Sequence, residues 1–155
     1  MKVEEFIKEY LENKESLSKH IVTTYVPYAT KIALSKNNVA ISLYKDGVYC
    51  LNSPIQYMLW VRMVIESYTD IRFSEDVQKE FDLLEENNIM AEIIPFIESD
   101  YDRFLKVFQL TVNDTIDREN NLISFLETKI EALEKAFNVM ETALTEVGDK
   151  IERTN

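Results

Sequence analysis

The stretch IEALEKAFNVMETAL, residues 130–144, decides the fold class, because its large apolar residues recur at steps of three and four. This spacing indicates an α-helix with one apolar face, and it continues in both directions along the chain. We name this row the C-terminal stripe; its members are Leu126, Ile130, Leu133, Phe137, Met140, Leu144, Val147 and Ile151. An apolar helix face must be covered, so the first question is what covers it.

The C-terminal stripe also fits a heptad repeat. Its a positions are Ile130, Phe137, Leu144 and Ile151, and its d positions are Leu126, Leu133, Met140 and Val147. Lys129 at a g position can pair with Glu134 at an e position of a parallel partner, whereas alanines at the next two g positions widen the apolar surface. Because a wide surface favours packing on several helices, we expect the stripe to pack within this chain. Self-association and capture of a foreign helix are the alternatives.

Length and composition indicate a single all-α domain. A chain of 155 residues, 46% of them apolar, is long enough to bury a core. Two glycines and three prolines are too few for the turns of an all-β protein. We predict a compact helical body over residues 1–98 and a long C-terminal helix or helical hairpin over residues 99–151. Asp46 and Gly47 allow one small β-hairpin near residues 39–51.

Local signals predict where the helices begin and end. A helix that begins at Pro27, PYATKIALSK, is expected to end near Asn38. In NSPIQ, Ser53 is the predicted cap of an apolar central helix, and Ser74 is the predicted cap of the helix that follows. A shorter helix, IMAEIIPFI, is expected to bend or end near Pro95, and Ser99 to cap the C-terminal helix.

No residue pattern indicates a catalytic, cofactor or metal site. The two glycines lie far apart at positions 47 and 148, so no phosphate-binding loop is present. His20 is the single histidine, and we interpret it as structural. Cys50 is the single cysteine, which excludes an internal disulfide and fits a reducing compartment. The acidic stretch ESDYD lacks the ligands and glycine that a calcium loop needs next. We therefore predict a non-enzymatic protein without a cofactor.

The sequence also predicts a location. Residues 1–14, MKVEEFIKEYLENK, alternate acid and base where a secretory signal needs an apolar run. The longest apolar run, YMLWVRMVI, is interrupted by Arg62 and is shorter than the roughly 20 residues that cross a bilayer. We expect a cytoplasmic protein that does not associate with membranes.

The net charge of −11 is concentrated in the middle of the chain, where residues 66–102 hold 2 basic and 12 acidic side chains. Such a segment repels phosphate backbones, so direct binding of nucleic acid is disfavoured. We name six of these acids the acidic surface: Glu75, Asp76, Glu80, Asp82, Glu85 and Glu86. It is expected to be a solvated helix face or, alternatively, an imitation of a phosphate backbone.

Two segments carry a resemblance to a protein group. KHIVTTYVPYATKIALSK, followed by NSPIQYMLWVRMVIESYTDI, is similar to small proteins of Firmicute phages and prophages, in which YVPY and KIAL precede a helix opened by NSP and closed by YTD. The resemblance covers most of the chain in order and spacing, and it carries over no catalytic residue. It implies a phage-encoded protein that contacts other proteins, phage or host.

Together these observations predict a phage accessory or virion-assembly protein that acts through helical interfaces. We expect it in the cytoplasm of the bacterial host or associated with the virion. The alternative is a small acidic inhibitor that blocks a host defence factor by mimicking nucleic acid.

Overall fold

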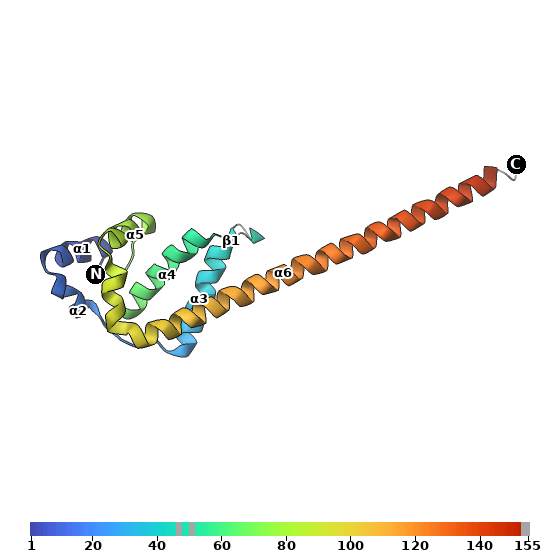
Figure 1. Ribbon diagram of the computed structural model, residues 1–155. Helices are drawn as coiled ribbons and strands as arrows, with labels where there is room; N and C mark the ends of the chain where they lie inside the picture. Colours follow the sequence, from blue (N-terminus) through green and yellow to red (C-terminus); the bar gives the residue numbers. More distant parts are fainter. Residues whose placement is uncertain (46–47, 50–51, 153–155) are drawn as a thin grey trace. The chain divides into compact units, whose positions relative to one another are not determined.

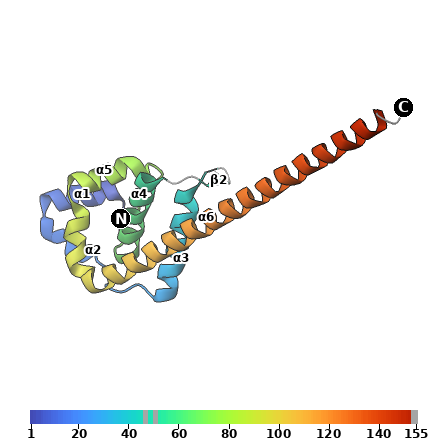
Figure 2. The same ribbon diagram turned by 45° about the vertical axis from the view of Figure 1, so that its right-hand side comes forward.

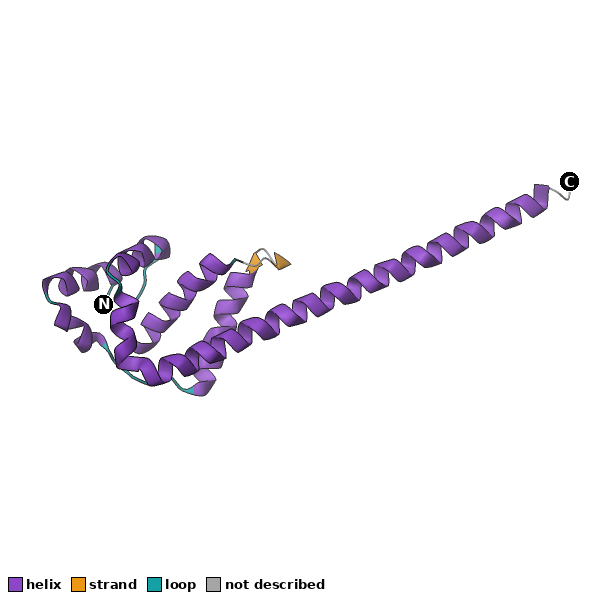
Figure 3. Cartoon of the chain, in the orientation of Figure 1, coloured by secondary structure: helices purple, strands orange, loops and turns teal. Residues whose placement is uncertain are grey.

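The computed structural model describes residues 1–45, 48–49 and 52–152, with side chains described for residues 1–43 and 52–140. Over these residues the chain is all-α apart from one short hairpin, as predicted (Figures 1 and 3). Its helices are α1 (Val3–Glu12), the 3-10 turn η1 (Lys14–Ser16), α2 (Leu17–His20), α3 (Tyr28–Leu43), α4 (Ser53–Tyr68), α5 (Val77–Glu86) and α6 (Ile89–Glu152).

The hairpin is shorter than the range predicted for it, residues 39–51. Strands β1 (Tyr44–Lys45) and β2 (Val48–Tyr49) pair antiparallel, with Tyr44 opposite Tyr49. Residues 39–43 belong instead to α3, so the prediction that this helix ends near Asn38 is wrong. The turn predicted at Asp46 and Gly47 lies outside the described residues.

The chain divides into a first unit, Met1–Thr115, and a second unit, Ile116–Asn155. The first unit therefore extends further than the body predicted for residues 1–98. The extra residues belong to α6, whose side chains at Ile93, Ile97, Phe104 and Phe108 are buried in the core.

The core of the first unit is built around the second half of α4, from Trp60 to Tyr68, where six residues are buried. The prediction of a helix buried on nearly every side is wrong for its first half, where Ile55 and Tyr57 are 41% and 52% exposed. Trp60 of α4 stacks on Phe108 of α6 with ring centroids 4.7 Å apart, and it meets Phe104 edge-on at 5.3 Å. Contacts of this kind stabilise a core beyond the burial of the rings alone. Helix α3 lies beside α4 in both views of the chain (Figures 1 and 2).

Two predicted caps are displaced by one or two residues. Asn52, not Ser53, caps α4, because its side chain accepts a hydrogen bond from the Ile55 amide at 3.2 Å. Asp76, not Ser74, caps α5 through the Lys79 amide at 3.4 Å. In both places the observed cap is a residue type that favours this position as much as the predicted one.

The long helix α6 differs most from the prediction. It runs as one helix from Ile89 to Glu152, so Ser99 is an interior residue and not a cap. Pro95 also lies inside the helix, where its ring removes one backbone hydrogen bond without ending the helix. The yellow part of α6 is bent (Figure 1), and a proline inside a helix is a common cause of such a bend. Asn87 and Asn88 separate α5 from α6, and Asn88 adopts a positive φ of 54° that asparagine tolerates.

Candidate interface on the long helix

The C-terminal stripe lies in the second unit, and side chains are described for its first five residues. All five are at least half exposed, from 50% at Leu126 to 66% at Phe137. Leu144, Val147 and Ile151 lie beyond the residues whose side chains are described. Within the second unit, these five residues therefore do not meet the expectation that the stripe is covered.

The continuity of α6 adds residues that sequence reasoning missed. The sequence predicts either one long helix or a helical hairpin over residues 99–151, and a break at Asn120 and Asn121 would have made the hairpin. Both asparagines lie inside α6. The heptad register therefore extends back to Ile123 at an a position, which is 46% exposed. Leu122 and Phe125 are exposed nearby. The signal for Ile123 was present in its spacing of seven from Ile130, once the helix is known to be unbroken.

Charged groups border the exposed apolar row. Lys129 lies over the ring of Phe125, with its Nζ 5.3 Å from the ring centroid, in a cation–π contact. Glu127 and Glu134 lie at the e positions and are exposed. The interface candidate is thus an apolar row with an acidic edge at e and a lysine at g.

One of the six acids of the acidic surface is buried. Glu80 is 3% exposed and its Oε2 accepts a hydrogen bond from the Ser74 amide at 2.6 Å, so its assignment to the surface is wrong. The other five acids are exposed. Glu85 accepts a hydrogen bond from the hydroxyl of Tyr57 at 3.4 Å; burial, and then the charge of Glu85, raise the pKa of that tyrosine.

A buried polar cluster joins four segments of the first unit. We name it the Asp100 cluster: Val26, Lys31, Tyr68 and Asp100. The Asp100 carboxylate accepts a hydrogen bond from the Lys31 ammonium at Oδ1. At Oδ2 it accepts bonds from the Val26 amide and the Tyr68 hydroxyl, each at 2.8 Å. Lys31 also lies over the ring of Tyr25, 5.1 Å from the centroid.

The electrostatics of the Asp100 cluster follow from its pairing. Burial acts to raise the pKa of Asp100, but the hydrogen bonds from Lys31, Val26 and Tyr68 outweigh it and hold that pKa below its usual range. Burial, together with the bond to Asp100, raises the pKa of Tyr68 far above its usual range. Both oxygens of the carboxylate thus accept hydrogen bonds, which is the pattern of a structural cluster.

His20, interpreted from the sequence as structural, lies between two carboxylates. Its Nδ1 donates to Asp70 Oδ1 at 2.9 Å, and its Nε2 is 3.5 Å from Glu9 Oε2. The ring also meets Phe6 edge-on at 5.5 Å, and the residue is 7% exposed. This environment agrees with the structural interpretation of His20.

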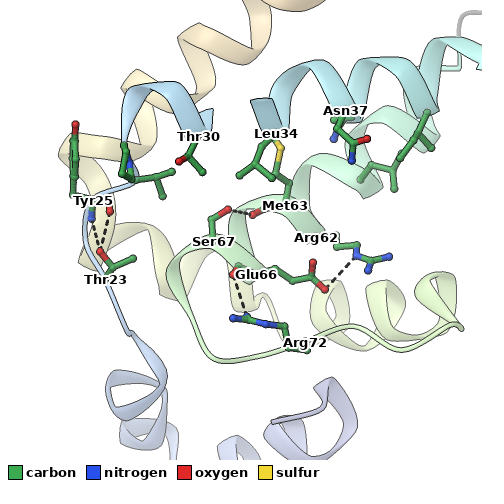
Figure 4. Close-up of a pocket in the computed structure, with 15 residues that line it drawn as sticks. Thr23, Tyr25, Thr30, Leu34, Asn37, Arg62, Met63, Glu66, Ser67 and Arg72 are labelled. Atoms are coloured by element: carbon green, nitrogen blue, oxygen red, sulfur yellow. Dashed lines mark hydrogen bonds and ion pairs between the residues drawn. The ribbon is translucent and has the colours of Figure 1, made fainter. Parts of the chain in front are cut away.

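A cavity of about 600 Å³ opens between α3, α4 and the segment that precedes α3 (Figure 4). Leu34 and Met63 form part of its apolar wall. Arg62 bonds Glu66 at 3.3 Å, and the guanidinium of Arg72 donates to three backbone carbonyls. Arg62 is therefore paired within α4, and Arg72 holds the turn that follows α4. Sequence reasoning did not single out this cavity.

Comparisons with known proteins add no relative. The chain matches no protein-family model, no curated protein and no solved structure. Among the helices that the structure describes, none combines the length and apolarity needed to cross a membrane.

Proposed function

We propose that this chain is a non-enzymatic phage or prophage protein, an accessory or virion-assembly factor that works by binding other proteins through helices. The exposed part of the C-terminal stripe, from Leu126 to Met140, carries the proposal. A contiguous row of large apolar side chains costs solubility, and exposed apolar patches of this kind commonly mark protein-binding surfaces. The phage setting rests on the resemblance of the YVPY, KIAL, NSP and YTD segments to phage proteins.

Affinity purification from infected host cells tests the proposal. Three tagged forms are compared: the wild type, Leu133→Asp, which places a charge in the stripe, and Thr128→Asp, which places the same charge at an exposed position off the stripe. We expect phage structural proteins to be recovered with the wild type and Thr128→Asp and lost with Leu133→Asp. Equal recovery by all three forms contradicts a role for the stripe.

The second candidate is the acidic inhibitor. Its support is the five exposed acids of the acidic surface that remain after Glu80 is removed. Ionic strength separates the two candidates, because salt screens contacts between exposed charges and leaves apolar contacts in place. Recovery of a host nucleic-acid-binding factor that is lost at high salt favours the inhibitor, whereas recovery that persists in high salt favours the stripe.

A further inference from the structure

We infer that the C-terminal stripe is covered by the same stripe of a second copy, in a parallel two-stranded coiled coil. The inference rests on the proposed function, that the stripe is a protein-binding surface, and it names the partner. The part of α6 that carries it, from Ile123 to Met140, is unbroken helix with described side chains.

The residue types at the a and d positions favour a coiled coil of two helices. The a positions begin with Ile123 and Ile130, and the d positions begin with Leu126 and Leu133. β-Branched residues at a with leucine at d favour parallel dimers, because each fits the different packing geometry of its layer. Phe137 at the next a position departs from this pattern and is the largest side chain of the row. The two isoleucine–leucine heptads before it therefore set the strand number.

The charges beside the row select the orientation. In an antiparallel pair the e positions of the two helices face each other, so Glu127 and Glu134 would oppose acids, which is unfavourable. In a parallel pair a g position faces the e position of the following heptad on the partner. Lys129 then faces Glu134 of the other copy, and no acid faces an acid along the described stretch.

The exposed area is sufficient for an interface. The six core residues from Ile123 to Met140 are between 46% and 66% exposed. This corresponds to roughly 600 Å² a copy and about 1,200 Å² for a pair, the lower end of specific interfaces. The sequence continues the register with Leu144, Val147 and Ile151. We therefore expect a dimer that dissociates on dilution.

Sedimentation equilibrium of the full chain, purified alone from a host without phage, tests the inference. We expect a mass of twice 18.2 kDa for the wild type and for Thr128→Asp. For Leu133→Asp, the dissociation constant of the dimer should be at least tenfold higher than for the wild type. Trp60, the single tryptophan, lies in the core of the first unit, so its fluorescence reports independently that each variant is folded.

Cysteine cross-linking tests the orientation. In a Cys50→Ser background, Ile123→Cys and Ile130→Cys should each form a disulfide with their own copies, since a-position Cα atoms in a parallel pair lie within disulfide reach. Cross-linking of Ile123→Cys with Met140→Cys, and of neither with itself, overturns the parallel arrangement.

The mass measurement also separates this inference from the proposed function. A wild-type chain that stays at 18.2 kDa at all concentrations overturns the inference. If that monomer still recovers phage proteins in a manner that depends on Leu133, the proposed function survives with a foreign partner. A dimer that is insensitive to Leu133→Asp overturns the assignment of the stripe.

Discussion

Replacing Asp100 by asparagine tests how the first unit is held together. The carboxylate and Lys31 are each 3% exposed at the side chain, so the substitution leaves a buried ammonium without its counter-charge. Breaking a buried ion pair in this way costs about 3–5 kcal/mol in free energy of unfolding. For a unit of this size we expect the melting temperature to fall by about 10–20 °C.

Urea unfolding followed by the fluorescence of Trp60 measures this loss. The midpoint should move to lower urea with an unchanged slope, because the surface exposed on unfolding stays the same. Asp102→Asn is the matched control, since it removes the same charge from an exposed site two residues further along α6. Adding Lys31→Met to Asp100→Asn should recover part of the loss, since no unpaired charge then remains buried. If Asp100→Asn costs no more than Asp102→Asn, the reasoning about the cluster is wrong.

Two further predictions concern the first unit. Hydrogen bonding holds the pKa of Asp100 below its usual range in the folded state. The stability that the carboxylate contributes is therefore present above about pH 4 and is lost as the pH falls through the folded-state pKa. The difference in urea midpoint between the wild type and Asp100→Asn should shrink at acid pH. Asn52→Ala should cost about 1 kcal/mol through loss of the α4 cap, whereas Ser53→Ala should cost clearly less, as compared by thermal unfolding.

The sequence predicts the fold class well because apolar periodicity is a local signal. The apolar spacing of residues 3–11 places five residues on one face of α1, and four of them, Val3, Phe6, Ile7 and Tyr10, are buried, whereas Leu11 is 63% exposed. The apolar composition of α4 likewise identified it as the central helix. An apolar helix face is buried against any apolar neighbour, so the burial of these two helices can be predicted from their own residues.

Helix α3 shows where this reasoning fails. Its buried residues include Lys31, Ser35, Asn38 and Ser42, while Ile41 is 55% exposed. Apolar spacing alone would place the polar residues outside. Lys31 is buried because Asp100, 69 residues away in the chain, supplies its counter-charge. No local pattern contains that pairing, so the Asp100 cluster could not be predicted.

The candidate interface was predicted in part. The residues of the C-terminal stripe and their helical spacing follow directly from the heptad pattern. The exposure of these residues does not follow from the pattern. A wide apolar face can be covered within a chain or by another chain, and the heptad pattern is the same in both cases. The continuity of α6 was also out of reach, since Pro95 and Asn120 disfavour a helix without forbidding it.

Oxidative labelling of Phe137 and Met140 tests the central claim most directly, that the stripe is a contact surface between chains. The purified full chain is labelled over a range of concentrations, with the exposed tyrosines of the first unit, Tyr25 and Tyr28, as internal references. We predict that labelling of the two stripe residues falls relative to the tyrosines as the concentration rises, and that a recovered partner protein has the same effect. Full labelling at every concentration and with every recovered protein, in a chain whose first unit is folded, would contradict the account.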